Sequence, residues 1–250
     1  MSSRPIRPSA EPGEASIGIL LLDYEGAGDP GDGASDRPLG DVGNAASFDY
    51  PVIYHRVKGL TFERVLEGGD ECESLVVEAA RKLVDLGVSG ISSDCGFLVS
   101  FQEAVSRAVH VPVLLSSMLQ LPIVAAGCGS ERPVLLITST DEGFDRCILE
   151  RVGMSAESSV IVKGLQAEPH FRGAILEGRL ELLDWGEIGR EVVRVVRESI
   201  QMEPRIGAIV FECTLLPPYR GLVQEATGLP VFDIITMIDF LHAGSHQCDR

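Results

Sequence analysis

The chain contains two segments that repeat each other around a cysteine. Cys95 follows GISSD and Cys213 follows AIVFE, so each cysteine comes after a short strand-like run that ends in an acidic residue. Apolar residues with helical spacing follow both cysteines, and Pro112 and Pro230 each lie 17 residues beyond their cysteine in matching segments. An internal repeat of this kind predicts two structurally equivalent halves. Equivalent halves usually face each other across a cleft, and we expect the two thiols to meet there.

The order of predicted elements is typical of an α/β protein. Apolar runs alternate with helical patterns at the spacing of parallel sheets joined by right-handed crossovers. Because each cysteine falls just past the carboxyl end of a predicted strand, both lie where open α/β sheets bind ligands. Asp70 and Glu73 resemble a capping box, and Gly87 provides a helix end. The predicted strands are 17–22, 52–57, 88–92, 111–115, 134–138, 160–162, 206–211 and 229–233, with helices at 70–86, at 185–200 and after each cysteine.

Composition excludes several classes of function. The 250 residues carry 37 acidic and 21 basic side chains, a formal charge of −16, which argues against binding to nucleic acid or to an anionic membrane surface. No apolar run approaches the roughly 20 residues of a membrane span, and the N-terminus lacks the order of a signal peptide. The sequence therefore predicts a cytoplasmic globular protein.

The six cysteines lack Cys-x-x-Cys spacing, which favours free thiols over disulfides or a metal site. Cys72 and Cys147 lie in helical apolar patterns, where packing is the expected role. His55, His110 and His170 have no acidic or cysteine partner at ligand spacing, so we expect no metal.

A long loop rich in Gly, Asp and Pro covers residues 23–49. Residues 26–31 match G-x-G-x-x-G, but Pro30 disfavours the helix that a dinucleotide site needs, and the neighbouring aspartates repel a pyrophosphate. We expect no cofactor. The loop is either a lid whose Asn44 and Tyr50 reach the cleft, or a flexible insertion.

Two thiols on opposite sides of one carbon can perform a reaction without a cofactor. One removes a proton and the other returns a proton from the opposite face, which inverts a stereocentre. A strand-to-helix junction offers free N–H groups and the positive end of a helix dipole, which favour the thiolate form and bind a carboxylate. The alternative interpretation is a pair of buried structural cysteines in a duplicated fold.

Other polar residues near the cysteines are candidates for support or for substrate binding. Asp94 and Glu212 precede the cysteines, and adjacent side chains of a strand point in opposite directions, so we expect them behind the site. Serine and threonine hydroxyls suit a carboxylate, although they also serve as caps. The candidate substrate-binding residues are Ser93, Gly96, Phe97, Thr214, Leu215, Ser116, Ser117, Asn44 and Tyr50.

At these residues the chain resembles the aspartate/glutamate racemase superfamily, which includes amino-acid racemases, hydantoin racemases, maleate isomerases and arylmalonate decarboxylases. The resemblance covers residues 17–238 and is strongest at Asp94-Cys95-Gly96 and Glu212-Cys213-Thr214. It implies two α/β domains related by a pseudo-twofold axis, each with a parallel four-stranded sheet, and a substrate buried in the cleft between them. It also implies that Cys95 and Cys213 are the paired acid and base.

The chain departs from the amino-acid racemases beside both cysteines. Those enzymes carry Asn-Thr after the first cysteine and Thr-His or Thr-Glu after the second, where this chain has Gly96-Phe97 and Thr214-Leu215. Residues 213–216 are closer to the maleate isomerase pattern. Residues 94–98 are similar to a branch that includes algal dimethylsulfoniopropionate lyases. Retention of both cysteines separates the chain from arylmalonate decarboxylases, which keep the second alone.

The resemblance also implies a domain arrangement and an assembly. We assign 1–15 to a disordered leader, 16–115 with 234–250 to the first α/β domain, and 116–233 to the second. Dimers, or dimers of dimers, are expected. The predicted function is a racemase or isomerase of a small carboxylate, an amino acid or a dicarboxylate. The alternatives are a carbon–sulfur lyase of the dimethylsulfoniopropionate type, or a module that binds a small anion without turnover.

Overall fold

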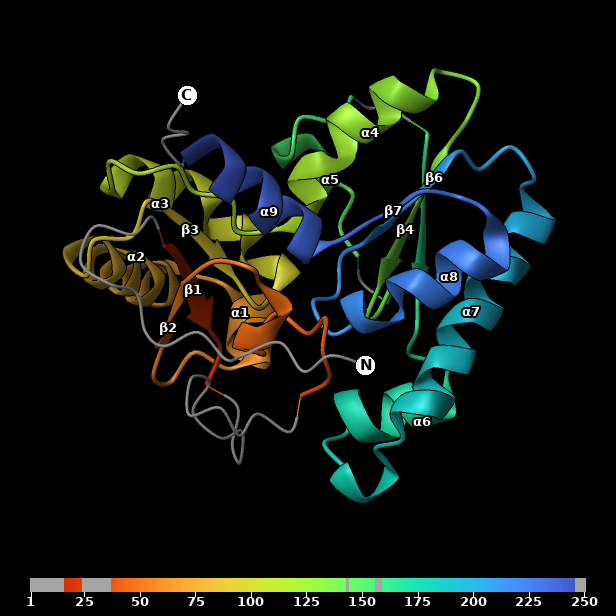
Figure 1. The fold of residues 1–250 in the computed structure, drawn as a ribbon, viewed down its shortest axis with the longest axis horizontal. Coiled ribbons are helices and arrows are strands. Elements are labelled where there is room, and N and C mark those ends of the chain that lie inside the picture. Colours follow the sequence, from red (N-terminus) through yellow and green to blue (C-terminus); the bar gives the residue numbers. More distant parts are fainter. Residues whose placement is uncertain (1–15, 24–36, 143, 156–158, 246–250) are drawn as a thin grey trace. The chain divides into compact units, whose positions relative to one another are not determined.

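The structure is a computed structural model that describes residues 16–23, 37–142, 144–155 and 159–245 (Figure 1). The proposed leader at 1–15 and the 24–36 part of the long loop lie outside the described residues. The chain divides into two compact units, residues 1–116 with 234–250 and residues 117–233. Each unit is an α/β structure with a parallel sheet, as the sequence predicts.

The first unit contains a three-stranded parallel sheet in the order β2-β1-β3. Its central strand β1 (Ile17–Leu21) is buried along its whole length, which explains why its residues are almost all apolar. The flanking strands are β2 (Val52–Arg56) and β3 (Gly90–Ser93), and the helices are α1 (Phe62–Glu67), α2 (Asp70–Asp85), α3 (Gln102–Ala108) and α9 (Ile234–Ser245). Two 3-10 helices, η1 (Ala45–Ser47) and η2 (Gly96–Phe101), complete the unit.

Helix α2 covers β1 through a close approach between backbone and side chain. A Cβ atom added to Gly18 in β1 would lie 2.9 Å from Cδ1 of Leu83, so glycine is what lets α2 pack this closely. The helix ends before Gly87, whose φ is +84°. The predicted capping box at Asp70 and Glu73 is wrong: Asp70 is already helical, and the N-cap is Gly69, which has no side chain to accept a bond.

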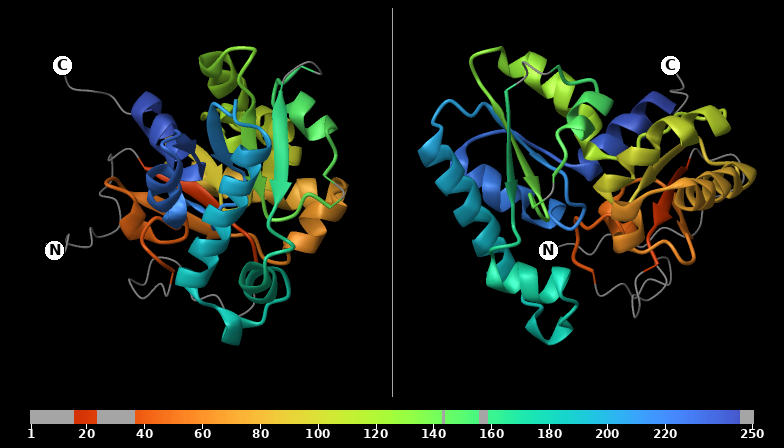
Figure 2. Two further views of the ribbon diagram at one scale, coloured as in Figure 1. Left: turned by 90° about the vertical axis from the view of Figure 1, so that its right-hand side faces the viewer. Right: turned by 180° about the vertical axis from the view of Figure 1, so that it is seen from behind.

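The second unit contains a four-stranded parallel sheet in the order β5-β4-β6-β7. Helices α7 and α8 lie side by side on one face of this sheet, and α4 lies on the other (Figures 1 and 2). The strands are β4 (Val134–Thr138), β5 (Val160–Gly164), β6 (Ala208–Phe211) and β7 (Val231–Phe232). The helices are α4 (Leu121–Cys128), α5 (Cys147–Arg151), α6 (Pro169–Phe171), α7 (Trp185–Met202) and α8 (Arg220–Thr227). Short helices η3 (Ser117–Gln120), η5 (Leu180–Leu182) and η6 (Pro217–Tyr219), and a π-helix η4 (Arg172–Leu176), occupy the connections.

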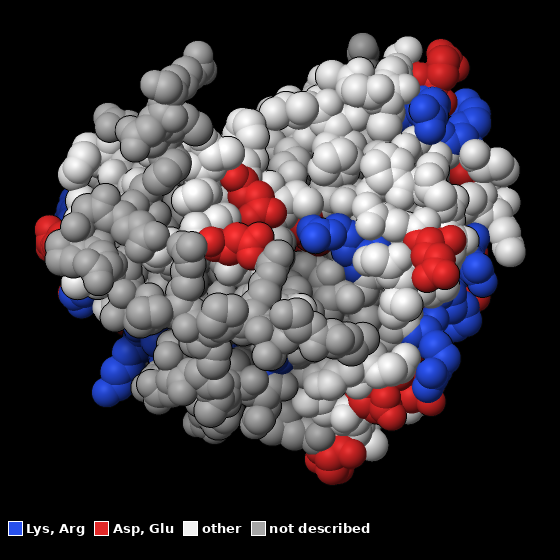
Figure 3. Space-filling view, in the orientation of Figure 1, with Lys and Arg blue, Asp and Glu red and all other residues white. Residues whose placement is uncertain are grey.

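The long helix α7 presents a charged outer face. Its exposed side chains form pairs at helical spacing, including Arg190 with Glu187 and Arg194 with Glu198. On the face drawn in Figure 3, both basic and acidic residues lie along the edge that α7 occupies in Figure 1. No helix among the described residues has the length and apolar composition of a membrane span.

The predicted strand at 111–115 is reduced to one bridge, between Ile91 and Val113, so the first sheet has three strands and not four. Side chains form hydrogen bonds with the backbone groups of 111–115 that would otherwise pair with a neighbouring strand. Gln102 donates to Val113 O at 2.7 Å and accepts from Leu115 N at 2.9 Å. The hydroxyls of Ser92 and Ser93 donate to the carbonyl oxygens of Leu114 and Leu115 at 2.7 and 2.6 Å.

Strand pairing nevertheless preserves the sequence repeat. Ile91 pairs with Val113, and Ile209 pairs with Val231 in the second unit, with the same interval of 118 residues between both sets of partners. The same holds for single hydrogen bonds, because Ile91 N donates to Pro112 O at 3.0 Å and Ile209 N donates to Pro230 O at 2.9 Å. The two halves of the sequence therefore build equivalent strand pairs.

Candidate active site

Both cysteines follow the carboxyl end of a strand, as the sequence predicts. Cys95 comes two residues after the end of β3 and has 5% of its surface exposed; Cys213 comes two residues after β6 and has 9% exposed. Both are free thiols. The chain turns in the same way after each, since Leu98 N donates to Cys95 O at 3.0 Å and Leu216 N donates to Cys213 O at 3.1 Å.

The α-helices begin later than the sequence predicts. Residues 96–101 form the 3-10 helix η2, and α3 starts at Gln102; in the second unit η6 precedes α8, which starts at Arg220. Each α-helix thus starts seven residues after its cysteine. A tight turn or 3-10 helix therefore follows each cysteine, and neither thiol lies at the N-terminus of an α-helix, contrary to the prediction from the sequence.

The acidic residues before the cysteines are buried and bind the neighbouring central strand. Asp94 Oδ1 accepts from Leu22 N at 2.9 Å, just beyond β1. Glu212 Oε2 accepts from the hydroxyl of Thr138 at 2.7 Å, and the same carboxylate accepts from Ser139 N just beyond β4. Desolvation by burial raises the pKa of Asp94 to about 6 and that of Glu212 to about 7. These two acids hold the ends of equivalent strands together.

The predicted serines also hold the backbone around the cysteines. The hydroxyl of Ser93 donates to Leu115 O and accepts from Cys95 N at 3.4 Å. In the second unit, the hydroxyl of Ser117 donates to Phe211 O at 2.6 Å, two residues before Cys213. Ser116 is fully buried next to this point of the chain. Ser93 and Ser117 therefore fix the strand ends that carry Cys95 and Cys213.

The residues that follow each cysteine are mainly apolar and buried. Gly96 and Phe97 form the first turn of η2, and the ring of Phe97 meets the edge of Phe62 with centroids 5.9 Å apart. Thr214 is 4% exposed, and Leu215 packs against the hydrophobic core of the second unit. The second residue after Cys95 is thus aromatic, unlike the polar residue of the amino-acid racemase pattern.

The two candidates in the long loop have local structural contacts. Asn44 caps η1, where its Oδ1 accepts from Ala46 N at 3.0 Å and its Nδ2 donates to Arg37 O at 2.9 Å. The hydroxyl of Tyr50 donates to Asp239 at 2.7 Å, and its ring stacks on His242 of α9 at 3.7 Å. Both residues secure the described part of the loop within the first unit.

A charged cluster beside Asp94 is not apparent from the sequence. Asp41 is fully buried, and its Oδ1 accepts from Arg37 Nη1 at 3.1 Å and from Gly43 N at 2.7 Å. The positive charge of Arg37 opposes the effect of burial on the pKa of Asp94, whereas Asp41 adds to it. Residues 37–43 therefore bring an opposite-charge pair to the end of the first sheet. The pairing depends on the path of the loop, and no motif in the sequence indicates that path.

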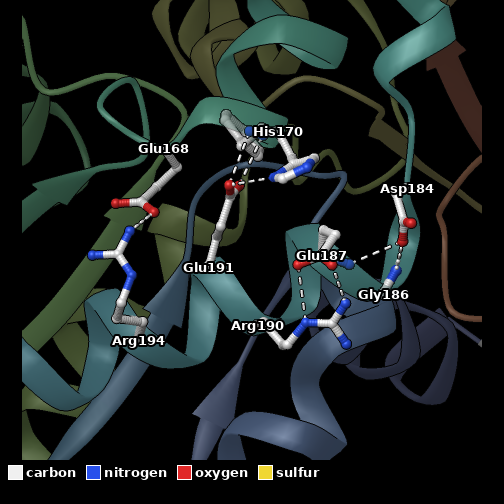
Figure 4. Close-up of polar contacts among 9 residues, drawn as sticks. Glu168, His170, Asp184, Gly186, Glu187, Arg190, Glu191 and Arg194 are labelled. Carbon is white, nitrogen blue, oxygen red and sulfur yellow. Dashed lines mark hydrogen bonds and ion pairs between the residues drawn. The ribbon is translucent and has the colours of Figure 1, made fainter.

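Two further ionic contacts in the second unit also join residues far apart in the chain. Arg220 at the start of α8 donates from Nη1 to both carboxylate oxygens of Asp233, at 3.0 Å each. Glu191 on α7 accepts from the backbone N–H groups of His170 and Phe171 and lies 2.9 Å from His170 Nδ1 (Figure 4). His170 thus has an acidic partner, Glu191, although the sequence places no acidic residue at metal-ligand spacing from it. Among the described residues no three His, Cys, Asp or Glu side chains are grouped to hold a metal ion.

Solved structures share this fold. A putative Asp/Glu racemase from Yersinia pestis has a TM-score of 0.60 at 14% identity, over 93% of this chain and all of that chain. A glycine-to-cysteine variant of arylmalonate decarboxylase has a TM-score of 0.57 at 20% identity, over 93% of this chain and 95% of that chain. The fold is that of the aspartate/glutamate racemase superfamily.

Curated relatives identify the branch. "Dimethylsulfoniopropionate lyase" of Durusdinium sp. clade D is 35% identical over 92% of this chain and 75% of its own length. "Dimethylsulfoniopropionate lyase 7" of Emiliania huxleyi is 36% identical over 88% of this chain and 64% of its own length. No family model matches the chain. The chain belongs to the family of the dimethylsulfoniopropionate lyases, which is a family of enzymes, and it spans 57 to 64% of the length of three E. huxleyi relatives.

Proposed function

We propose that this protein is a carbon–sulfur lyase that converts dimethylsulfoniopropionate to acrylate and dimethyl sulfide. The observation that carries the proposal is the 35% identity to the Durusdinium lyase over 92% of the chain, which includes both cysteine junctions. The comparisons thus favour the lyase, which was the alternative from the sequence, over a racemase of amino acids.

The proposed reaction needs one base and no redox partner. A cysteine thiolate removes a proton from the carbon next to the carboxylate, and the electron pair of that C–H bond forms the new C=C bond. The C–S bond breaks with its electrons on sulfur, which leaves as neutral dimethyl sulfide. The thiol then returns its proton to solvent. One thiolate is sufficient for this step, and the second thiol can donate or accept a proton on the other face.

The equivalence of the two cysteine turns supports a role for both thiols, because Leu98 N donates to Cys95 O and Leu216 N donates to Cys213 O in the same way. We therefore propose that both junctions act on one substrate. The Gly96-Phe97 pair also suits a sulfonium substrate. A sulfonium group has no N–H to donate, so it does not need the polar side chains with which an amino-acid racemase binds an amino group.

The direct test is an assay of the purified full chain with dimethylsulfoniopropionate. Dimethyl sulfide is measured by headspace gas chromatography and acrylate by liquid chromatography, and we expect equal amounts of the two products. Cys95→Ala and Cys213→Ala should each lower the rate, and loss of the base should cost about 10²–10⁴-fold. Cys147→Ala is the control, since this thiol bonds Asp145 on the surface of the second unit and should keep full activity. Absence of both products with the wild type would reject the proposal.

A racemase or isomerase of a small carboxylate remains the second candidate. The equivalence of the two cysteine turns favours it, because a two-base reaction needs matched acid and base positions. Single enantiomers of acidic amino acids, incubated with the protein in deuterated water, should then acquire label at the α-carbon in both enantiomeric products. If no acid tested exchanges while dimethyl sulfide is released, the lyase alone stands.

A further inference from the structure

A small cavity in the first unit collects basic side chains on an otherwise acidic protein. It lies between the end of β2 and helix α2, which pack side by side (Figure 1), and has a volume of about 250 Å³. Its lining consists of His55, Arg56, Val57, Lys58, Leu75, Glu78, Ala79 and Lys82. The chain has only three lysines, at positions 58, 82 and 163, and two of them line this cavity.

Two polar side chains of the cavity, Lys58 and His55, are available to a ligand. Lys58 forms no ion pair with any described residue, and the ring nitrogens of His55 form no hydrogen bond within the described part of the chain. Lys82 forms an ion pair with Glu78 at 2.7 Å, and both side chains line the cavity. Desolvation and the charge of Lys82 lower the pKa of His55, and its imidazole carries an N–H that can donate to a ligand.

The shape and charge of the cavity select the class of ligand. Ammonium groups on flexible stems bind phosphate as point charges, and an imidazole N–H adds a directed donor. Val57, Leu75 and Ala79 provide an apolar floor beneath the charged rim. The volume lies just below the roughly 300–1,000 Å³ of sites for drug-sized ligands, which limits the organic part to a small group.

We propose that this cavity binds the phosphate group of a small phosphorylated molecule, with Lys58 and Lys82 as the charged contacts and His55 as a donor. The site contains neither Cys95 nor Cys213, and the proposal is independent of the lyase reaction. It assigns to the first unit a binding site for an anion that is neither substrate nor product of the proposed reaction.

The test is isothermal titration of the full chain with inorganic phosphate and with phenyl phosphate, at constant ionic strength balanced with chloride. We expect saturable binding of one equivalent, tighter for phenyl phosphate because of the apolar floor. Lys58→Gln and Lys82→Gln should each weaken binding by at least about fivefold, given a loss of about 1 kcal/mol per charge contact. Lys163→Gln on β5 is the matched control and should bind as the wild type does.

Two further variants keep the test decisive. Glu78→Gln removes a negative charge and releases Lys82, and it should tighten phosphate binding. Cys95→Ala should bind phosphate unchanged, which separates this cavity from an anion bound near the catalytic thiols. Equal weakening in all three lysine variants, no saturation, or binding lost in Cys95→Ala would each overturn the proposal.

Discussion

The hydroxyl of Thr138 donates a 2.7 Å hydrogen bond to the carboxyl group of Glu212, the residue immediately before Cys213. Glu212 is 1% exposed, and the bond joins the end of β4 to the end of β6. The position of a candidate catalytic thiol thus depends on a buried acid whose protonation changes near neutral pH.

The first prediction concerns the pH dependence of stability at Glu212. Burial raises its pKa from 4.5 to about 7, so this carboxyl contributes full stability below about pH 4.5 and loses it as the pH rises through 7. Glu212→Gln should remove that loss and gain on the order of 2 kcal/mol relative to the wild type between pH 5 and pH 8. Urea unfolding at both pH values measures the difference, with the exposed Glu181→Gln as control. If the free energy of unfolding of the variant differs from that of the wild type by the same amount at both pH values, the prediction is contradicted.

The ion pair of Arg220 and Asp233 should be strongly coupled. The Asp233 side chain is 1% exposed, so Arg220→Met leaves a buried carboxylate without the guanidinium and should cost about 3 kcal/mol of unfolding free energy. Asp233→Asn combined with Arg220→Met should cost less than the sum of the single changes, since the coupling of such pairs is about 0.5–3 kcal/mol. A double-mutant cycle from urea unfolding tests this. Additive effects would show that the pair contributes nothing as a pair.

Glu191 should act as a cap for α6 supplied by another helix. Its carboxylate accepts two backbone N–H groups, from His170 and Phe171, which have no partner within so short a helix (Figure 4). Glu191→Ala should destabilise the second unit by about 2 kcal/mol. Glu187→Ala, one helical turn earlier on the surface of α7, is the control and should match the wild type. Thermal unfolding of both variants measures the contrast, and equal midpoints would refute the capping role.

Replacement of Gly164 or Gly221 by alanine should change the free energy of unfolding in opposite directions. A Cβ on Gly164 at the end of β5 would lie 2.4 Å from the backbone N of Asp141, so Gly164→Ala should destabilise the protein by about 1–3 kcal/mol. Gly221 lies within α8, and a Cβ added there would have no atom within 4 Å, so Gly221→Ala should stabilise the protein by about 0.5–1 kcal/mol through helix propensity. Chemical denaturation compares the two. The same sign for both changes would contradict the prediction.

Local sequence patterns predict most of the elements of the fold. Buried strands such as β1 and β4 are almost entirely apolar, and α7 has a clear apolar stripe, so their types follow from composition and period. The strand at 111–115 fails because Ser92, Ser93 and Gln102 compete for its backbone groups. Such competition depends on tertiary contacts, which a local pattern does not contain.

The candidate site follows the same division. The repeat places Cys95 and Cys213 at equivalent strand ends, because each cysteine directly follows an apolar run that the sequence identifies as a strand. The contacts of Ser93, Asn44 and Tyr50 are not predictable, since each hydroxyl or amide binds a partner elsewhere in the chain that only the fold brings near. The roles of the cysteines and of the substrate-binding residues stay predictions until the variants are assayed.

The return of α9 to the first unit has a consequence for biosynthesis. Leu241 of α9 packs on Gly90 of β3 so closely that an added Cβ would lie 2.9 Å from its Cγ. The first unit therefore lacks part of its core until residue 241 has left the ribosome, whereas residues 117–233 emerge as one uninterrupted stretch. The last core residues of the earlier unit are thus synthesised after the whole of the later unit.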